Sequence, residues 1–278
     1  VPGGWAFQYL NDFYPDVDDT AMVVMALHRV DPEKYKIPVS RGKEWIIGMQ
    51  SKNGGWGAFD IDNEHYILQH IPFADHGALL DPPTADVTAR CLSMLAQLGE
   101  NKRNPNVVRA LSFLRDEQED DGSWFGRWGN NYVYGTWSVL CALNAINEDP
   151  EQIYIKKAID WLKGRQRSDG GWGEDCGSYW QHRRDEVKSS TPSQTAWAVL
   201  GLIAAGEIDS ISVRGGIDYL LREISEKGLW HEKYFNAVGF PRVFYLRYHG
   251  YSSFFPLLTL SRYRCLKVNG EKFPKHGL

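Results

Sequence analysis

The sequence predicts an all-α protein, an α/α barrel in which inner and outer helices form two concentric rings. Three observations support this fold class: a repeated motif, polar and apolar helical segments that alternate around it, and weak strand signals throughout. The complete copies of the motif Q-x-x-x-G-x-W cover residues 50–56, 118–124 and 166–172. A degenerate copy ends at Trp230, with Ile224 in place of the glutamine, and the opening Gly-Gly-Trp ends at Trp5 like another copy.

Each motif lies between two segments with helical periodicity. The preceding segment places apolar residues at helical spacing on a polar background, as in residues 107–118 and 154–166. The following segments are more apolar and cover residues 20–30, 87–98, 135–146, 193–205 and 251–263. We therefore expect the polar helices in the outer ring and the apolar helices in the inner ring. Threonines stand near the start of four of the apolar segments, where they suit a first helical turn: Thr20, Thr88, Thr136 and Thr195.

The motif itself has a structural interpretation. Its glycine ends the outer helix or permits a tight turn, and its glutamine can hydrogen-bond the end of a neighbouring helix while the tryptophan stacks over it. We therefore expect the motif to define the fold and to carry no chemistry.

The repeats predict one α/α-barrel domain over residues 1–266. Residues 267–278 are polar, contain two glycines and a proline, and are expected to form a C-terminal tail that leaves the core. The chain opens with Val1 rather than Met and begins inside a repeat. We therefore expect a piece of a longer protein, with the barrel incomplete and little or no activity on its own.

The composition limits the possible classes of function. A net charge of −4 gives no indication of nucleic-acid binding. The four cysteines show no CxxC spacing, which is typical of reduced thiols rather than of a disulfide framework or a zinc site. The longest apolar run, residues 196–206, is about half the length that a membrane-spanning helix needs. The chain contains 11 Trp, 14 Tyr and 12 Phe, an excess that packing alone does not explain.

One short motif points to acid chemistry. Asp16, Asp18 and Asp19 stand in the sequence DVDDT, directly before an apolar helix. Carboxylates this close cannot all ionise readily, so one of them is driven to hold a proton, while a helix N-terminus stabilises the conjugate base. A simple helix cap is the structural alternative. A calcium loop is excluded, because Ala21 and Leu27 occupy its glycine and glutamate positions.

The combination of DxDD with several Q-x-x-x-G-x-W copies resembles the squalene–hopene cyclase family of class II triterpene cyclases. The resemblance runs from residue 1 to about residue 265, and further matching stretches cover residues 3–14, 54–63, 81–88, 122–136, 170–176, 190–197 and 238–245. It implies the catalytic C-terminal part of an enzyme that cyclises squalene to hopene-type pentacyclic triterpenes. In that family an aspartic acid protonates a terminal alkene, and aromatic rings stabilise the carbocations that follow.

The resemblance also implies roles for charged residues. Asp18, the middle acid of DxDD, corresponds to the proton donor, with Asp16 and Asp19 holding and tuning it. Asp86 corresponds to a member of the same hydrogen-bond network. Arg90 stands where well-studied relatives have histidine; a guanidinium stays charged, so it can stabilise an aspartate but cannot relay a proton.

Further residues match the family's cavity. The tyrosine that helps to return a proton through water corresponds to Tyr134. The rings that face cations correspond to Phe7, Phe240 and Phe244. The wall and positioning residues correspond to Trp128, Tyr248 and Tyr251, and Phe59 is a further candidate for substrate contact. A narrow entrance to the cavity corresponds to Phe73. Each ring taken alone is more often a core residue than a site residue.

The resemblance implies no metal and no cofactor, because initiation by protonation needs no diphosphate. The expected partners are squalene or a related polyprene and a membrane surface, with no nucleic acid. A full-length homodimer is expected, as is peripheral or monotopic attachment to the cytoplasmic side of the cell membrane.

Two other functions stay open. One is a cyclase for another polyprene, such as a sporulene-type substrate. The other is a non-catalytic α/α toroid that binds a partner or a polyprenyl chain. A protein prenyltransferase subunit shares the toroid, but the sequence contains no zinc-type set of Asp, Cys and His.

Overall fold

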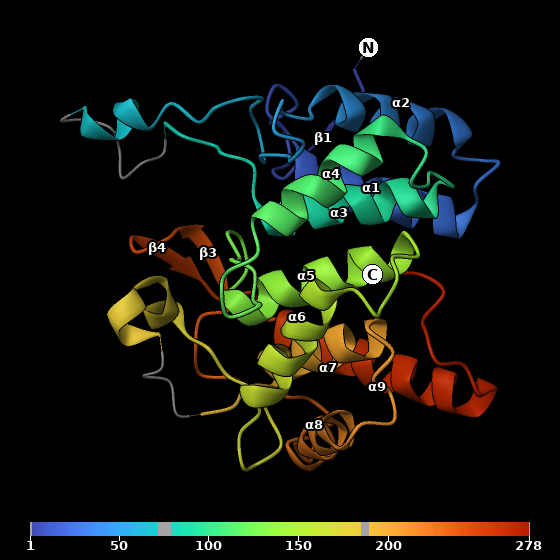
Figure 1. Cartoon of the computed structure of the whole chain (residues 1–278), viewed down its shortest axis with the longest axis vertical. Helices are drawn as coiled ribbons and strands as arrows, with labels where there is room; N and C mark the ends of the chain where they lie inside the picture. Colours follow the sequence, from blue (N-terminus) through green and yellow to red (C-terminus); the bar gives the residue numbers. More distant parts are fainter. Residues whose placement is uncertain (1, 72–78, 185–188, 278) are drawn as a thin grey trace. The chain divides into compact units, whose positions relative to one another are not determined.

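The computed structural model describes residues 2–71, 79–184 and 189–277, which are mainly helical (Figure 1). The helices at the predicted inner positions are α1 (Val17–Val30), α3 (Ala85–Gln97), α5 (Tyr132–Ala145), α7 (Pro192–Ala204) and α9 (Tyr251–Asn269). The helices at the predicted outer positions are α2 (Lys36–Gly48), α4 (Pro105–Asp116), α6 (Ile153–Gly164) and α8 (Ile211–Arg222). Two antiparallel hairpins are formed by β1 (Trp5–Ala6) with β2 (Pro15–Asp16) and by β3 (Ala237–Phe240) with β4 (Phe244–Leu246). Short 3₁₀ helices are η1 (Tyr66–His70), η3 (Cys176–Tyr179) and η4 (Gln181–Arg183).

The chain divides into two compact units, Val1–Glu117 and Gln118–Leu278. In the first unit, α1 packs against α2 and α3, and α3 packs against α4. In the second unit, α5 packs against α6 and α7, and α7 packs against α8 and α9. All residues of α7 are buried, whereas α6 and α8 bury one face each. The predicted burial is therefore confirmed for α3, α5 and α7, which are buried on nearly every side, whereas α1 and α9 bury only part of their surface among the described residues.

The motif glycines make the tight turns after the polar helices. The backbone φ angles of Gly54, Gly122 and Gly170 are 96°, 96° and 88°, in the left-handed region that favours glycine. A Cβ atom on these residues would lie 2.5–2.7 Å from a backbone carbonyl oxygen of the next polar helix. The glycine is thus required both for its conformation and for the close approach of two backbones.

The motif glutamines tie each turn to the following helix, as expected. In each complete copy the Nε2 atom donates to the glycine carbonyl in its own turn and to a carbonyl near the start of the next polar helix. The pairs of accepting residues are Gly54 and Asn106 for Gln50, Gly122 and Tyr154 for Gln118, and Gly170 and Ser212 for Gln166. Each glutamine therefore connects the turn after one polar helix to the start of the next polar helix.

The motif tryptophans are joined to the predicted threonines. The backbone N–H of each tryptophan donates to the threonine Oγ1 atom in the first turns of the following buried helix, at 2.8–3.0 Å. The pairs are Trp5 with Thr20, Trp56 with Thr88, Trp124 with Thr136, and Trp172 with Thr195. Since these groups are buried, an unpaired tryptophan N–H would be costly, which accounts for a threonine at this position.

The C-terminal segment differs from the expectation. Helix α9 continues to Asn269 and ends at Gly270, whose φ is 68°. The carbonyl of Pro274 accepts a hydrogen bond from Asn144 Nδ2 at 3.0 Å, and the carbonyl of Gly277 accepts one from Arg262 at 2.9 Å. The tail therefore returns to α5 and α9 instead of leaving the core, because half-buried side-chain donors on these helices bind its carbonyl groups.

Candidate active site

The DVDDT motif forms the N-terminus of α1. Asp16 is the N-cap, with extended backbone angles, and its Oδ1 atom accepts the backbone N–H of Asp19 at 2.9 Å. Only 7% of Asp16 is exposed. Burial, and then the negative charge of Asp18, raise the pKa of Asp16 to about 8. The expected crowding of carboxyl groups is present, and Asp16 is protonated at neutral pH.

Asp19 is the second carboxyl with a raised pKa. Burial and the charge of Asp18 raise the pKa of Asp19 to about 6, while the positive charge of Arg90 acts in the opposite direction. As the pH falls, Asp16 therefore binds a proton near pH 8 and Asp19 binds one near pH 6, on either side of Asp18.

Asp18 is paired with Arg90. The Nε atom of Arg90 donates to Oδ1 of Asp18 at 2.9 Å, and the exposed fractions of the two side chains are 7% for Arg90 and 27% for Asp18. Arg90 also donates to the sulfur of Met22 at 3.4 Å. Oδ2 of Asp18 accepts no hydrogen bond from the residues that the structure describes. One oxygen of Asp18 is thus fixed by a cation, and the other is available to a reacting molecule.

Helix α3 supplies the remaining predicted group of this unit. Asp86 lies one turn before Arg90, so both occupy the same face of α3. Asp86 is 2% exposed, and the hydroxyl of Thr84 donates to its Oδ1 atom at 2.6 Å. Cys91 follows Arg90 and is fully buried; burial and the charge of Asp18 raise its pKa. The sequence analysis did not single out Cys91, which no local motif marks.

The two predicted rings of this unit differ in their surroundings. Phe7 follows β1 and is 61% exposed. The ring centroid of Phe59 lies 5.1 Å from that of Tyr14. Phe73 lies outside the described residues.

In the second unit, predicted and unpredicted rings gather between α5, α7 and α9. Tyr134 is 4% exposed in the first turn of α5, and its ring centroid lies 5.0 Å from that of Trp197. Tyr251 lies 5.0 Å from both Tyr248 and Phe255. Among the described residues, this ring cluster includes Tyr134, Trp137, Trp197, Tyr248, Tyr251 and Phe255. Trp137, Trp197 and Phe255 were missed; aromatic residues inside apolar helices were the available signal.

Phe240 and Phe244 lie on the β3–β4 hairpin, paired across it. The Arg127 guanidinium carbon lies 4.2 Å from the ring centroid of Trp128 and 5.7 Å from that of Phe240. Both distances are those of cation–π contacts, which indicates electron-rich ring faces at this position. Arg127 was not among the sequence candidates, because nothing in its local sequence predicts which rings it meets.

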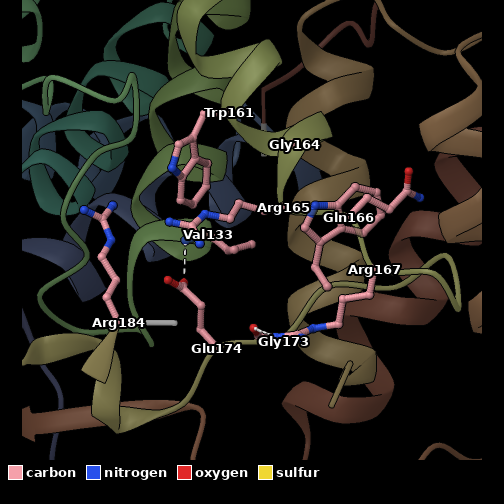
Figure 2. A pocket seen from close by; sticks show the side chains of 10 residues that line it. Val133, Trp161, Gly164, Arg165, Gln166, Arg167, Gly173, Glu174 and Arg184 are labelled. Carbon is pink, nitrogen blue, oxygen red and sulfur yellow. Dashed lines mark hydrogen bonds between the residues drawn. The ribbon is translucent and has the colours of Figure 1, made fainter. Parts of the chain in front are cut away.

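A cavity of about 340 Å³ lies elsewhere in this unit, beside the last turn of α6 (Figure 2). The carboxylate of Glu174 accepts the backbone N–H groups of Val133 at 2.7 Å and of Asn131 at 3.3 Å, at the start of α5. Arginines line the same cavity, and none of the predicted site residues does. Such a polar wall does not suit a hydrocarbon, so we assign Glu174 a structural role: it fixes the first turn of α5, which carries Tyr134.

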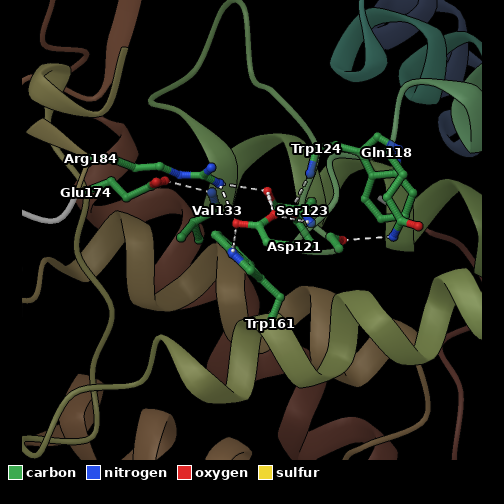
Figure 3. Close-up of polar contacts among 10 residues, drawn as sticks. Gln118, Asp121, Ser123, Trp124, Val133, Trp161, Glu174 and Arg184 are labelled. Atoms are coloured by element: carbon green, nitrogen blue, oxygen red, sulfur yellow. Dashed lines mark hydrogen bonds and ion pairs between the residues drawn. The ribbon is translucent and has the colours of Figure 1, made fainter. Parts of the chain in front are cut away.

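The neighbouring ion pair of Arg184 and Asp121 also has a structural role. Arg184 contacts Asp121 at 2.9 Å and donates to the hydroxyl of Ser123 at 2.9 Å (Figure 3). The indole N–H of Trp161 donates to the same carboxylate at 2.9 Å. Side-chain hydrogen bonds and the charge of Arg184 hold the pKa of Asp121 below its usual value, although burial opposes them. The network joins the turn before Trp124 to α6.

The described residues also bear on metal sites and membrane-spanning helices. Among them, no group of His, Cys, Asp and Glu side chains could hold a metal ion. No helix in the described parts of the chain is long and apolar enough to span a bilayer.

Comparison with known proteins gives the family. The model of the squalene–hopene cyclase C-terminal domain matches residues 1–265. The chain is 58% identical to a squalene–hopene cyclase of Bradyrhizobium diazoefficiens and 56% identical to that of Zymomonas mobilis. Each alignment covers 100% of this chain and 43% of the relative, so the chain spans less than half the length of these proteins.

A solved structure agrees with the fold. The type II terpene cyclase MstE from Scytonema, in its apo form, superimposes with a TM-score of 0.61 at 19% identity, covering 87% of this chain and 64% of the other. At this identity the similarity concerns the fold alone. The family model and the two relatives, together with the DVDDT acids and the repeat, show that the chain belongs to the squalene–hopene cyclase family, in its C-terminal domain.

Proposed function

We propose that this chain carries the catalytic acid of a cyclase that converts squalene into hopene-type pentacyclic triterpenes. The observation that carries the proposal is the Asp18–Arg90 pair, flanked by two carboxyl groups with raised pKa values. An alkene is a very weak base, so its protonation needs an acid whose conjugate base is stabilised at once. A buried guanidinium 2.9 Å from the carboxyl supplies that stabilisation.

The proton balance of the first step follows from this geometry. Asp18 is charged when it pairs with Arg90, so the step first requires a proton from a neighbouring carboxyl. Protonated Asp18 then transfers this proton from Oδ2 to a terminal alkene carbon, whose π electrons form the new C–H bond. The products are a tertiary carbocation and the Asp18 carboxylate, which faces Arg90. Because Arg90 keeps its charge, it does not return the proton. Asp16, whose pKa is raised to about 8, is a neighbouring carboxyl that can supply this proton.

The later steps need rings that bind cations without reacting. Cyclisation moves the positive charge along the folded chain until a proton is lost. We propose Phe7, Phe240 and Phe244 as rings that face these cations, and Trp128, Tyr248 and Tyr251 as walls. We propose that Phe59 also contacts the substrate and that Tyr134 helps to return a proton through water. The contact of Phe240 with Arg127 supports its capacity to bind a cation.

Squalene is insoluble in water and partitions into bilayers, so we propose that the full-length protein acts as a peripheral or monotopic protein at the cytoplasmic membrane surface. Flotation with liposomes containing squalene tests this proposal, since a protein that stays with the soluble fraction would contradict it. The expected homodimer stays a prediction, to be tested by analytical ultracentrifugation in detergent.

The function is tested by Asp18→Asn in the full-length protein, with exposed Asp12→Asn as the charge-matched control. Gas chromatography with mass spectrometry of products formed from squalene should show near-complete loss of cyclised hydrocarbon for Asp18→Asn and wild-type amounts for the control. Unchanged turnover in Asp18→Asn would contradict the acid. Wild-type protein that cyclises another polyprene but not squalene would support the second cyclase function, and one that cyclises neither would support a non-catalytic toroid.

A further inference from the structure

The base of the β3–β4 hairpin is fixed to a neighbouring segment. The N–H of Val238 donates to the carbonyl of Trp128 at 3.1 Å, and Ala237 forms a bridge with Gly129. The sheet register is irregular between Val238 and Phe240, so β3 bends where its aromatic residue begins. The base therefore constrains Trp128 and β3 but not the far end of the hairpin.

Arg242 fixes the far end. It lies in the turn between β3 and β4, and its Nε atom donates to the carbonyl of Tyr179 at 2.9 Å. Its guanidinium carbon lies 5.0 Å from the ring centroid of Trp180. Its backbone N–H donates to the hydroxyl of Tyr245 at 2.8 Å. The hairpin tip is thus attached to the end of η3 and to Trp180, which precede it by about 60 residues in the sequence.

The backbone conformation of Arg242 indicates that its side-chain contacts, and not the turn, explain an arginine at this position. Its φ angle is 72°, in the left-handed region where glycine is favoured and a side chain is strained. Glycine would make the same turn without this strain, so the turn itself does not require arginine. The side-chain contacts with Tyr179 and Trp180 are what arginine adds.

The rings Phe240 and Phe244 lie between the two attachments. Their backbones pair across the hairpin, and the Phe244 ring lies so close to Gly239 that a Cβ atom there would be 2.2 Å from it. A cavity of about 450 Å³, lined by Trp180, Arg242 and Tyr245 among others, adjoins the tip. Tyr245 also contacts Cys176 and Tyr179, but from within β4 rather than at the tip. Without the Arg242 contacts, the tip therefore has more room to move into this cavity, and both rings would shift with it.

We propose that Arg242 is a positioning residue that determines how far cyclisation proceeds, because it holds Phe240 and Phe244 where they meet the carbocations. The inference rests on the proposed cyclase function. Cation–π attraction depends on the distance between cation and ring, so a displaced ring stabilises its cation less. A cation that is stabilised less at one stage loses its proton earlier, and the product then contains fewer rings.

The test compares wild type, Arg242→Gly and the control Arg247→Ala in the full-length protein. Arg247 is exposed and follows β4, so the control removes the same charge from the same region. Glycine suits the left-handed turn, so we expect Arg242→Gly to keep the wild-type melting temperature to within about 2 °C. Hydrogen exchange of residues 237–246 should become about tenfold faster in Arg242→Gly, as expected for local loosening, and unchanged in the control.

The second readout is the product mixture from squalene. The ratio of incompletely cyclised to pentacyclic products should rise roughly fivefold in Arg242→Gly, the effect of weakening one cation–π contact, and stay at the wild-type value in the control. An unchanged ratio would overturn the inference, as would a changed ratio without faster exchange. If the wild type forms no cyclic product, the cyclase function and this role fail together, whereas faster exchange with an unchanged product ratio refutes Arg242 alone.

Discussion

Asp16 gives the sharpest prediction for stability. Its carboxyl has an ordinary pKa of 3.8 and a pKa of about 8 in the folded chain. Between these values the folded state binds one proton more than the unfolded state. Stability is therefore lost as the pH rises through this window, at about 1.4 kcal/mol per pH unit from this group. Above pH 8 the folded state also releases the proton, and the loss ends.

The perturbation is Asp16→Asn. Asparagine keeps a side-chain oxygen that can accept the N–H of Asp19, so the helix cap is preserved. It removes the titrating group, so the variant should lose about 3 kcal/mol less stability than the wild type between pH 5 and pH 7. At pH 7 the variant should be the more stable protein, by at most about 4 kcal/mol.

The measurement is urea unfolding of the full-length protein at half-unit steps from pH 5 to pH 9, followed by the fluorescence of its tryptophans. Asp12→Asn removes an exposed charge from the preceding loop and should keep the wild-type slope against pH. Equal slopes for wild type and Asp16→Asn would refute the reasoning. So would a variant that is less stable than the wild type at pH 7, since that result requires a favourable buried carboxylate.

Other predictions concern the repeat and the Asp121 network. Gly170→Ala should destabilise more than Gly228→Ala, by roughly 1 kcal/mol or more in thermal melts, because both have positive φ but only the first places a Cβ 2.5 Å from a carbonyl oxygen. Equal losses would show that the close approach is unimportant. Asp121→Asn should lower the free energy of unfolding at pH 7 by weakening the pair with Arg184. Because folding lowers the pKa of Asp121, the difference in free energy of unfolding between variant and wild type should shrink as the pH falls below 3.8. A difference that grows in this range would contradict the prediction. Thr195→Val should cost about 1–3 kcal/mol in urea unfolding by leaving a buried N–H unpaired, and a neutral result would argue that the bond is dispensable.

The sequence by itself determined the features that depend on local pattern. The apolar segments after three of the motif copies predicted the buried helices α3, α5 and α7, because a helix surrounded by others needs apolar residues on every side. The glycine and the first bond of the motif glutamine act within one turn, so these roles could be predicted from spacing. The second bond, from Gln166 to Ser212, 46 residues later, was predicted only as a contact with some neighbouring helix end. The crowding of Asp16 and Asp19 around one helix N-terminus was likewise local.

Only the tertiary structure decided which residues meet across long stretches of chain. Arg90 contacts Asp18 although 72 residues separate them, and Arg242 reaches Tyr179 across 63. The same holds for Glu174, which caps a helix whose first turn lies 41 residues earlier. A charged side chain binds whichever partner the packing of buried helices brings near, and that packing depends on the summed contacts of the whole unit rather than on any local pattern.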